Sequence, residues 1–162
     1  MDIRFTFDDE LSAGIERAVA AHQDFEPAMI DIEALMLNKM KLRFIDGEGP
    51  DGAPWLPSHR AIEEGGQTLI DTRALFNSLT GDHDSFSAVA GTNMFYARPN
   101  QEGVTIRPRT DSGKRALKTP FGPRASVEIP ARPFAGFGAD EMRGIPEILV
   151  DFLSGAWAGG AV

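Results

Sequence analysis

Apolar residues at helical spacing mark two amphipathic helices in the first third of the chain. Residues 9–22 carry the first, after an alternating stretch at 3–7 that predicts a short strand. Residues 25–44 carry the second, with Pro27 in its first turn. The methionine-rich face of this helix is expected to fill the core, and a partner surface is the alternative. That face comprises Met29, Ile32, Met36, Leu37, Met40 and Phe44.

Glycine and proline interrupt this pattern and predict a turn-rich loop over residues 46–54. Trp55 follows the loop and is expected to fold back onto the helices, where its ring would anchor the turn. Residues 59–66 are polar and are expected to be exposed. Apolar residues four apart then predict a short helix at 74–79.

The second half of the chain alternates in the manner of strands. Residues 86–91 and 94–97 predict a strand pair around Thr92-Asn93. Residues 104–106 and 126–129 predict an antiparallel pair. The connection between this second pair is long and rich in turn-forming residues, a length that is typical of a functional or disordered segment.

A last apolar stripe predicts a C-terminal helix at residues 139–153. Pro146 is expected either to kink this helix or to mark its real first turn. The order of elements gives an α+β fold: two N-terminal helices, a small mostly antiparallel sheet with a long basic loop, and a C-terminal helix. We expect a single domain at residues 1–154, with the loop at 108–125, followed by a flexible tail at 155–162.

Charge is distributed unevenly along the 162-residue chain, whose formal net charge is −8. Residues 104–132 hold seven basic and two acidic side chains, so this segment carries +5 and the remaining chain −13. Overall acidity argues against general affinity for nucleic acid, because phosphate binding relies on lysine and arginine. The basic residues of the segment are Arg107, Arg109, Lys114, Arg115, Lys118, Arg124 and Arg132.

No motif of catalytic specificity is present in the sequence. The absence of cysteine excludes disulfides and thiolate nucleophiles. His22, His59 and His83 share no ligand-type spacing, and the acidic turns at 46–51 and 82–84 miss the patterns of calcium and zinc sites. We therefore expect no enzyme activity, cofactor or metal, with a hydrolase built on a carboxylate pair across the fold as the alternative. No apolar run could span a bilayer, and the N-terminus lacks the pattern of a signal peptide.

Three stretches in order resemble one family. They are Arg43-Phe44 with Pro50-Asp51-Gly52-Ala53-Pro54-Trp55-Leu56-Pro57, then residues 68–79 with 89–93 and 96–97, then Ile129-Pro130-Ala131-Arg132-Pro133-Phe134-Ala135-Gly136-Phe137. Over residues 25–153 the chain thus resembles the phage virion morphogenesis family, the tail-completion proteins of Mu-like tailed phages. It departs from the family pattern after Tyr96-Ala97, where Gln101 and Gly103 are kept but the usual histidine is missing. It departs again at Arg73, where the family often has glycine.

The resemblance implies a structural protein of the head–tail neck, found in the virion and assembled in the host cytoplasm. Such a protein forms a homo-oligomeric ring, for which we expect six-fold symmetry, and completes the tail so that the head can join. Its partners would be neighbouring neck or connector proteins and the tail tube protein, with DNA passing through the channel without specific recognition. A head-closure (stopper) ring of the connector and a DNA-contacting assembly factor are the alternatives.

Subunit contacts are expected from the basic loop and from two further positions. The loop at 108–125 would reach an acidic surface of a neighbour, with Phe121 at the centre of the contact; a solvated flexible loop and contact with DNA are the alternatives. Trp157 would dock on a neighbour. Pro130 and Pro133 fix an extended path on which Phe134 and Phe137 are expected to pack the core. Arg132, on the same path, would pair with a carboxylate at a subunit interface.

Overall fold

Helices α2 to α4 come first, the short strands follow, and helix α6 comes last, so the α+β class is confirmed. The computed structural model describes residues 20, 24–108, 116–119 and 122–158, and for 156–158 it describes the backbone alone. Within these residues the strands form three two-stranded sheets, in which β1 pairs with β2, β3 with β6 and β4 with β5. The described residues divide into two compact units, and helix α2 (Glu26–Asp46) contributes to both. The first unit comprises 20, 24–39, 80–90 and 139–158, and the second comprises 40–79, 91–108, 116–119 and 122–138.

Helix α2 confirms the prediction made for residues 25–44. Pro27 lies in its first turn, where the N–H that proline lacks would have had no partner within the helix. The helix ends before Gly47, whose φ of +74° is the left-handed conformation that closes many helices. The strand predicted at 3–7 and the helix predicted at 9–22 lie outside the described residues.

In the first unit, helix α6 (Ala139–Ala158) packs against α2. Gly144 allows close approach of the two helices, because a Cβ at this position would lie only 2.9 Å from Leu35 Cδ2. Lys39 Nζ and Asp140 Oδ2 form an ion pair of 2.5 Å between the helices. Apolar packing and this ion pair together fix how α6 lies along α2.

Helix α6 begins where the sequence predicted it and continues through Pro146. Its first turn carries Asp140 and Glu141, whose negative charges stabilise the positive end of the helix dipole. This favourable start explains why the expectation that Pro146 marks the first turn is wrong.

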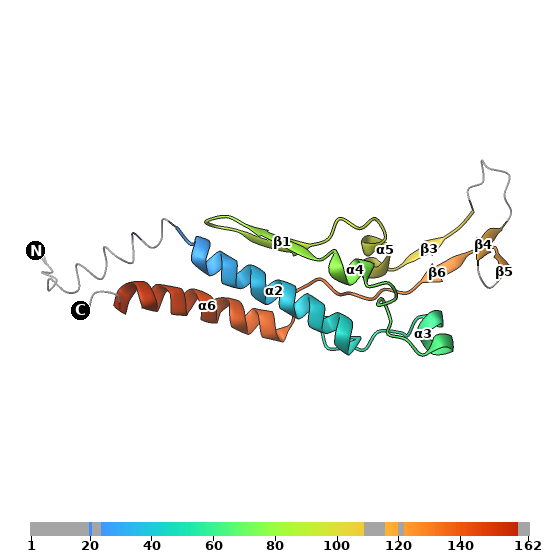
Figure 1. The fold of residues 1–162 in the computed structure, drawn as a ribbon, viewed down its shortest axis with the longest axis horizontal. Coiled ribbons are helices and arrows are strands. Elements are labelled where there is room, and N and C mark those ends of the chain that lie inside the picture. Colours follow the sequence, from blue (N-terminus) through green and yellow to red (C-terminus); the bar gives the residue numbers. More distant parts are fainter. Residues whose placement is uncertain (1–19, 21–23, 109–115, 120–121, 159–162) are drawn as a thin grey trace, which may run out of the picture. The chain divides into compact units, whose positions relative to one another are not determined.

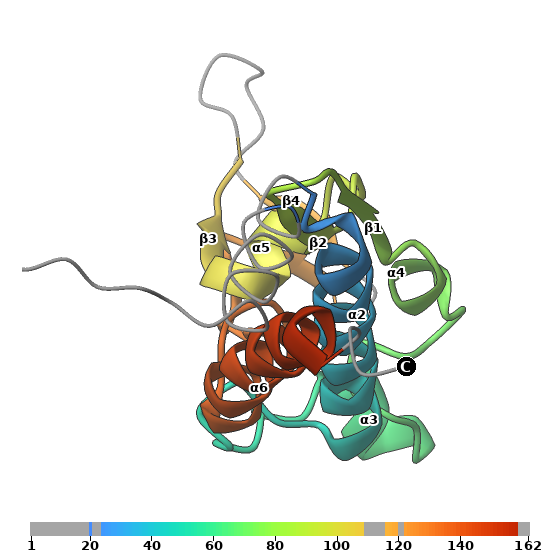
Figure 2. The same ribbon diagram turned by 90° about the vertical axis from the view of Figure 1, so that its left-hand side faces the viewer.

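A hairpin of strands β1 (Thr80–His83) and β2 (Ala88–Gly91) completes the first unit. Asp84 closes its turn: Oδ1 accepts the N–H groups of Phe86 and Ser87 at 2.8 Å each. These hydrogen bonds lower the pKa of Asp84, the one from the Phe86 amide most. Figures 1 and 2 show the hairpin and α6 on different sides of α2.

The predicted pairing of residues 86–91 with 94–97 is wrong. The second predicted strand is instead the entry to helix α5 (Ala97–Glu102). Thr92 Oγ1 accepts the Met94 amide at 3.1 Å and bends the chain, and Pro99 then lies in the first helical turn, where it is readily accommodated.

The second unit contains the other two ribbons. Strands β3 (Val104–Ile106) and β6 (Val127–Ile129) pair antiparallel with Val104 opposite Ile129, which confirms the predicted pair. Strands β4 (Leu117–Thr119) and β5 (Gly122–Arg124) form a further hairpin inside the segment expected to be a loop. The expectation of a loop throughout 108–125 is therefore corrected. Pro123 in β5 hid this strand, because proline is rare in strands except at edges.

The core of the second unit is a cluster of aromatic rings on Phe44. Phe44 is 1% exposed, and its ring centroid lies 5.2 to 6.0 Å from those of Trp55, Phe76 and Phe134. The predicted anchoring role of Trp55 and the predicted burial of Phe134 are thus confirmed. Phe137 is 61% exposed, so its expected place in the core is wrong. Gly136, at φ +144°, turns the chain after Phe134 has filled the space beside Phe44.

Two short helices flank this core. Helix α3 (His59–Glu64) is capped by the Ser58 side chain, which accepts the Ala61 N–H, and has no buried residue, in accord with the exposure expected for residues 59–66. Helix α4 (Ala74–Asn77) confirms the predicted short helix and buries Leu75.

Candidate functional site

The segment from Ile129 to Phe137 is fixed in the second unit by side chains from three distant parts of the chain. The first is Arg43, near the end of α2. It is buried, and its Nη1 donates to the carbonyls of Phe134 at 3.1 Å and Gly136 at 2.8 Å. A buried guanidinium that binds two carbonyls fixes the backbone as well as satisfying its own donors.

The loop after α2 contributes a reciprocal pair of hydrogen bonds. Trp55 Nε1 donates to the Pro133 carbonyl at 3.0 Å. Arg132 Nε donates in the other direction, to the Leu56 carbonyl at 2.8 Å. Each segment therefore donates one side-chain hydrogen bond to a backbone carbonyl of the other.

Gln101 of α5 supplies the third set of contacts. Its Oε1 accepts the N–H groups of Phe134 and Ala135 at 3.0 Å each, and its Nε2 donates to the Ala135 carbonyl at 2.7 Å. Gly103 follows at φ +75°, and a Cβ there would lie 2.8 Å from the Ala131 nitrogen. Gln101 and Gly103, which keep the family pattern after Tyr96-Ala97, are thus the residues that contact this segment.

Arg73, which stands where the family often has glycine, adopts φ +61° directly before α4. Left-handed backbone is unfavourable for residues with a Cβ and is the conformation that glycine adopts readily. Leu69 has a similar φ of +62°. Arg73 therefore places a residue with a Cβ at a left-handed position, which adds strain to the backbone.

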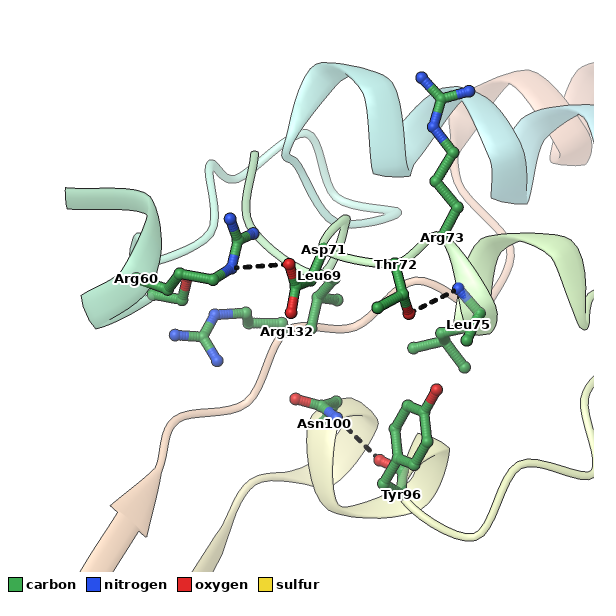
Figure 3. Close-up of a pocket in the computed structure, with 11 residues that line it drawn as sticks. Arg60, Leu69, Asp71, Thr72, Arg73, Leu75, Tyr96, Asn100 and Arg132 are labelled. Atoms are coloured by element: carbon green, nitrogen blue, oxygen red, sulfur yellow. Dashed lines mark hydrogen bonds and ion pairs between the residues drawn. The ribbon is translucent and has the colours of Figure 1, made fainter. Parts of the chain in front are cut away.

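A hollow of about 340 Å³ opens beside these two strained residues. Figure 3 shows Arg60 entering from α3, Asp71 and Thr72 from the segment that leads into α4, and Tyr96 and Asn100 from α5. Arg132 completes the lining from the segment after β6. Arg60 Nη2 donates to the carbonyls of Gln67 and Ile70 at 2.7 and 2.9 Å, and its Nε lies 3.7 Å from Asp71 Oδ1.

Arg132 is the most deeply buried polar residue of this hollow. It is 6% exposed, and burial lowers the pKa of its guanidinium from the ordinary value. The hollow can therefore present a desolvated positive charge to a small anionic group.

The structure separates the residues that the sequence suggested for partner contacts. Arg107 is exposed after β3, and Lys118 and Arg124 are exposed on the β4–β5 hairpin, where they border a second hollow of about 450 Å³. Arg132 lies in the first hollow instead. Four of the other members lie outside the described residues: Arg109, Lys114, Arg115 and Phe121. For Trp157 the structure describes the backbone alone.

Sequence reasoning did not single out Arg43, Arg60 or Gln101 as functional. Arg43 and Gln101 belong to the family-like stretches, so the resemblance carried a signal for them. Nothing in the spacing of Arg60 indicates that it meets Arg132 at one hollow, because 72 positions separate them.

In the first unit, a hydrogen bond between His83 and Glu33 depends on pH. His83 Nδ1 lies 2.5 Å from Glu33 Oε2, which joins the β1–β2 hairpin to α2. The hydrogen bond to Glu33 is the largest cause of a raised His83 pKa, and desolvation opposes it. A protonated His83 is therefore the form that holds the hairpin to the helix.

Among the described residues, no three potential metal-binding side chains converge on one point. A search of the same residues for a helix of the length and hydrophobicity needed to cross a membrane found none.

Comparison with curated proteins and with solved structures gave no match. The model of the phage virion morphogenesis family matches residues 8–154, which is most of the chain and includes the segments that meet around Phe134 and Arg132. The protein therefore belongs to the phage virion morphogenesis family.

Proposed function

We propose that this protein is a ring-forming tail-completion protein, or tail terminator, of the phage head–tail neck. Membership in the family points to a structural role in phage virion morphogenesis. The more specific role is to end tail growth and to offer a surface to which the head connector joins. This work depends on shape and association, so we assign the protein no bond-making chemistry.

The observation that carries the proposal is the amount of apolar surface left exposed. Thirteen large apolar side chains among the described residues are at least 37% exposed, and Phe95 reaches 88%. Large contiguous apolar patches are rare on soluble monomers and mark protein interfaces where they occur. Both units contribute to the set: Ile30, Leu42, Ile45, Leu56, Ile62, Phe86, Val89, Phe95, Val104, Ile106, Phe137, Met142 and Val150.

Charge supports a ring with a head-to-tail interface. A closed ring repeats one contact between two different patches, so the patches must be complementary. The exposed cations Lys118 and Arg124 lie on one hairpin of the second unit, while the chain as a whole carries a net charge of −8. A basic patch that meets an acidic surface on the next subunit gives such a contact.

The proposed partners follow from the proposed role. They are further copies of the chain in a ring of six, the adjoining neck or connector proteins, and the tail tube protein. The ring would lie in the virion after assembly in the host cytoplasm. DNA would pass through the channel without specific recognition, because the net negative charge disfavours binding to phosphate.

Light scattering coupled to size-exclusion chromatography, with and without purified tail tubes, tests the ring. We expect a closed oligomer at high protein concentration or on the tubes, visible as rings in negative-stain images. A strict monomer under both conditions contradicts the proposal. Anisotropy of a labelled DNA duplex at low salt tests the alternative, since salt-sensitive binding would favour a DNA-contacting factor.

A further inference from the structure

The hollow in the second unit contains a buried cation, Arg132, that has no acidic partner within the described part of the chain. Arg132 donates through Nε to Leu56 O, and its two Nη groups have no hydrogen-bond or ion-pair partner among the described residues. Burial of a charged group is costly unless the charge is paired. The free Nη groups form the side of the guanidinium fork that binds a carboxylate through two parallel hydrogen bonds.

The other charges around the hollow leave it with one positive charge to neutralise. Asp71 lies beside Arg60, so the pair is close to neutral. Arg73 also borders the hollow, but Figure 3 shows its side chain pointing away from the other labelled residues. Arg132 therefore sets the local charge, and a single carboxylate matches it better than a phosphate dianion does.

The hollow has further features of a binding site. Its volume of about 340 Å³ lies within the range of small-ligand pockets and leaves room for an acidic side chain. The hydroxyl group of Tyr96 offers a neutral donor on its wall. Two residues with strained left-handed backbone, Leu69 and Arg73, form part of its rim, and such strain is concentrated at binding sites.

We propose that this hollow, the Arg132 pocket, receives an aspartate or glutamate side chain from a second copy of the chain. The proposal rests on the ring-forming function, because the second copy is the next subunit of the ring. Charge complementarity favours this source: the chain has 24 acidic and 16 basic side chains, so its surface supplies many carboxylates and few cations. Arginine is suited to such contacts because its fork holds a carboxylate in a fixed orientation.

Acetate serves as a probe of the pocket that does not require association. We would follow the Arg132 Nε–H signal by NMR during titration of the full chain with sodium acetate, with sodium chloride at equal ionic strength as the control. We expect acetate alone to shift the signal. Asp71→Asn, which removes a negative charge from the lining of the pocket, should tighten acetate binding several-fold. Absence of any acetate-specific shift in the folded protein overturns the carboxylate site.

Self-association identifies the source of the carboxylate. We expect Arg132→Gln to weaken association by at least about tenfold, as loss of a bidentate charged contact does. Asp71→Asn should strengthen it, and acetate should weaken it more than chloride does. Arg98→Gln, which removes an equal charge from an exposed pair with Glu102, should leave it unchanged. If the two residues only supported the fold, both substitutions would weaken association. Stronger association of Asp71→Asn therefore tests the proposal even if Arg132→Gln folds poorly.

The outcomes separate this inference from the proposed function. A wild-type chain that never associates contradicts the ring, whereas the acetate response is read on the monomer. Association that is unaffected by acetate and by both pocket substitutions overturns the second copy as the occupant, while the ring itself stands.

Discussion

At the scale of single residues, backbone conformation explains both what this chain keeps of its family pattern and what it changes. Gly103 is kept where a Cβ would collide with the Ala131 nitrogen. Arg73 replaces glycine where the backbone is left-handed but is still able to accommodate a side chain. A steric clash permits no substitution without rearrangement, whereas strain of this kind costs only about 1–3 kcal/mol.

Arg73→Gly should raise the free energy of unfolding by about 0.5–1 kcal/mol. The substitution removes left-handed strain, and the greater backbone entropy of glycine in the unfolded chain offsets part of the gain. Arg98→Gly inside α5 is the matched control and should lower stability by about 1 kcal/mol, because its backbone is helical. Urea unfolding of the three proteins measures both effects. Loss of stability in the Arg73 variant would show that its side chain contributes more than its backbone costs.

Gln101→Ala should destabilise the second unit by about 2–3 kcal/mol. The substitution leaves the N–H groups of Phe134 and Ala135 without an acceptor in a half-buried position, and unsatisfied donors carry the full cost of desolvation. Glu102→Ala, one position along the same helix, removes only an exposed ion pair and should cost less than about 0.5 kcal/mol. Equal losses in the two variants, measured by urea unfolding, would contradict the role given to Gln101.

At the scale of elements, the β1–β2 hairpin is attached to α2 by a titratable pair, so this attachment depends on pH. The His83 pKa is raised by Glu33 in the folded protein. A raised pKa means that the folded state binds the proton more tightly than the unfolded state. The stabilisation is therefore complete below the ordinary His83 pKa of 6.5 and is lost as pH rises through the raised value.

Glu33→Gln should remove most of this dependence, because Glu33 is the largest cause of the raised His83 pKa. We expect the stability difference between wild type and this variant to be greatest at acidic pH and to shrink as the pH rises above 6.5, the ordinary His83 pKa. Urea unfolding across pH 5 to 9 measures the difference, and an NMR titration of the His83 ring should show its pKa falling in the variant. A difference that grows with pH would contradict the assignment.

The same elements show where sequence patterns predict a fold and where they do not. The helix at 25–44 and the pairing of 104–106 with 126–129 were predictable, because periodicity reports the face that each element buries. The β1–β2 pairing was missed because β1 is polar and short. The Arg132 pocket could not be predicted, since four segments far apart in the chain build it and only tertiary packing brings Arg60 to Arg132.

At the scale of the whole molecule, the proposed association should depend on charge at the β4–β5 hairpin. Lys118 and Arg124 are exposed there, beside the second hollow. Long-range attraction between a basic patch and an acidic surface accelerates encounter and weakens with salt. A ring held partly in this way should form more slowly at high ionic strength, while its apolar contacts persist.

The double variant Lys118→Gln with Arg124→Gln should therefore slow ring formation at low salt and reduce its salt dependence. Arg98→Gln with Arg143→Gln is the control of equal net charge, since both of these cations already pair with acids on their own helices. Stopped-flow light scattering at several salt concentrations compares the association rates. A similar loss of rate in both variants would assign the effect to net charge alone. Unchanged rates in the hairpin variant would place the subunit contact elsewhere, on the apolar surface that the described residues leave exposed.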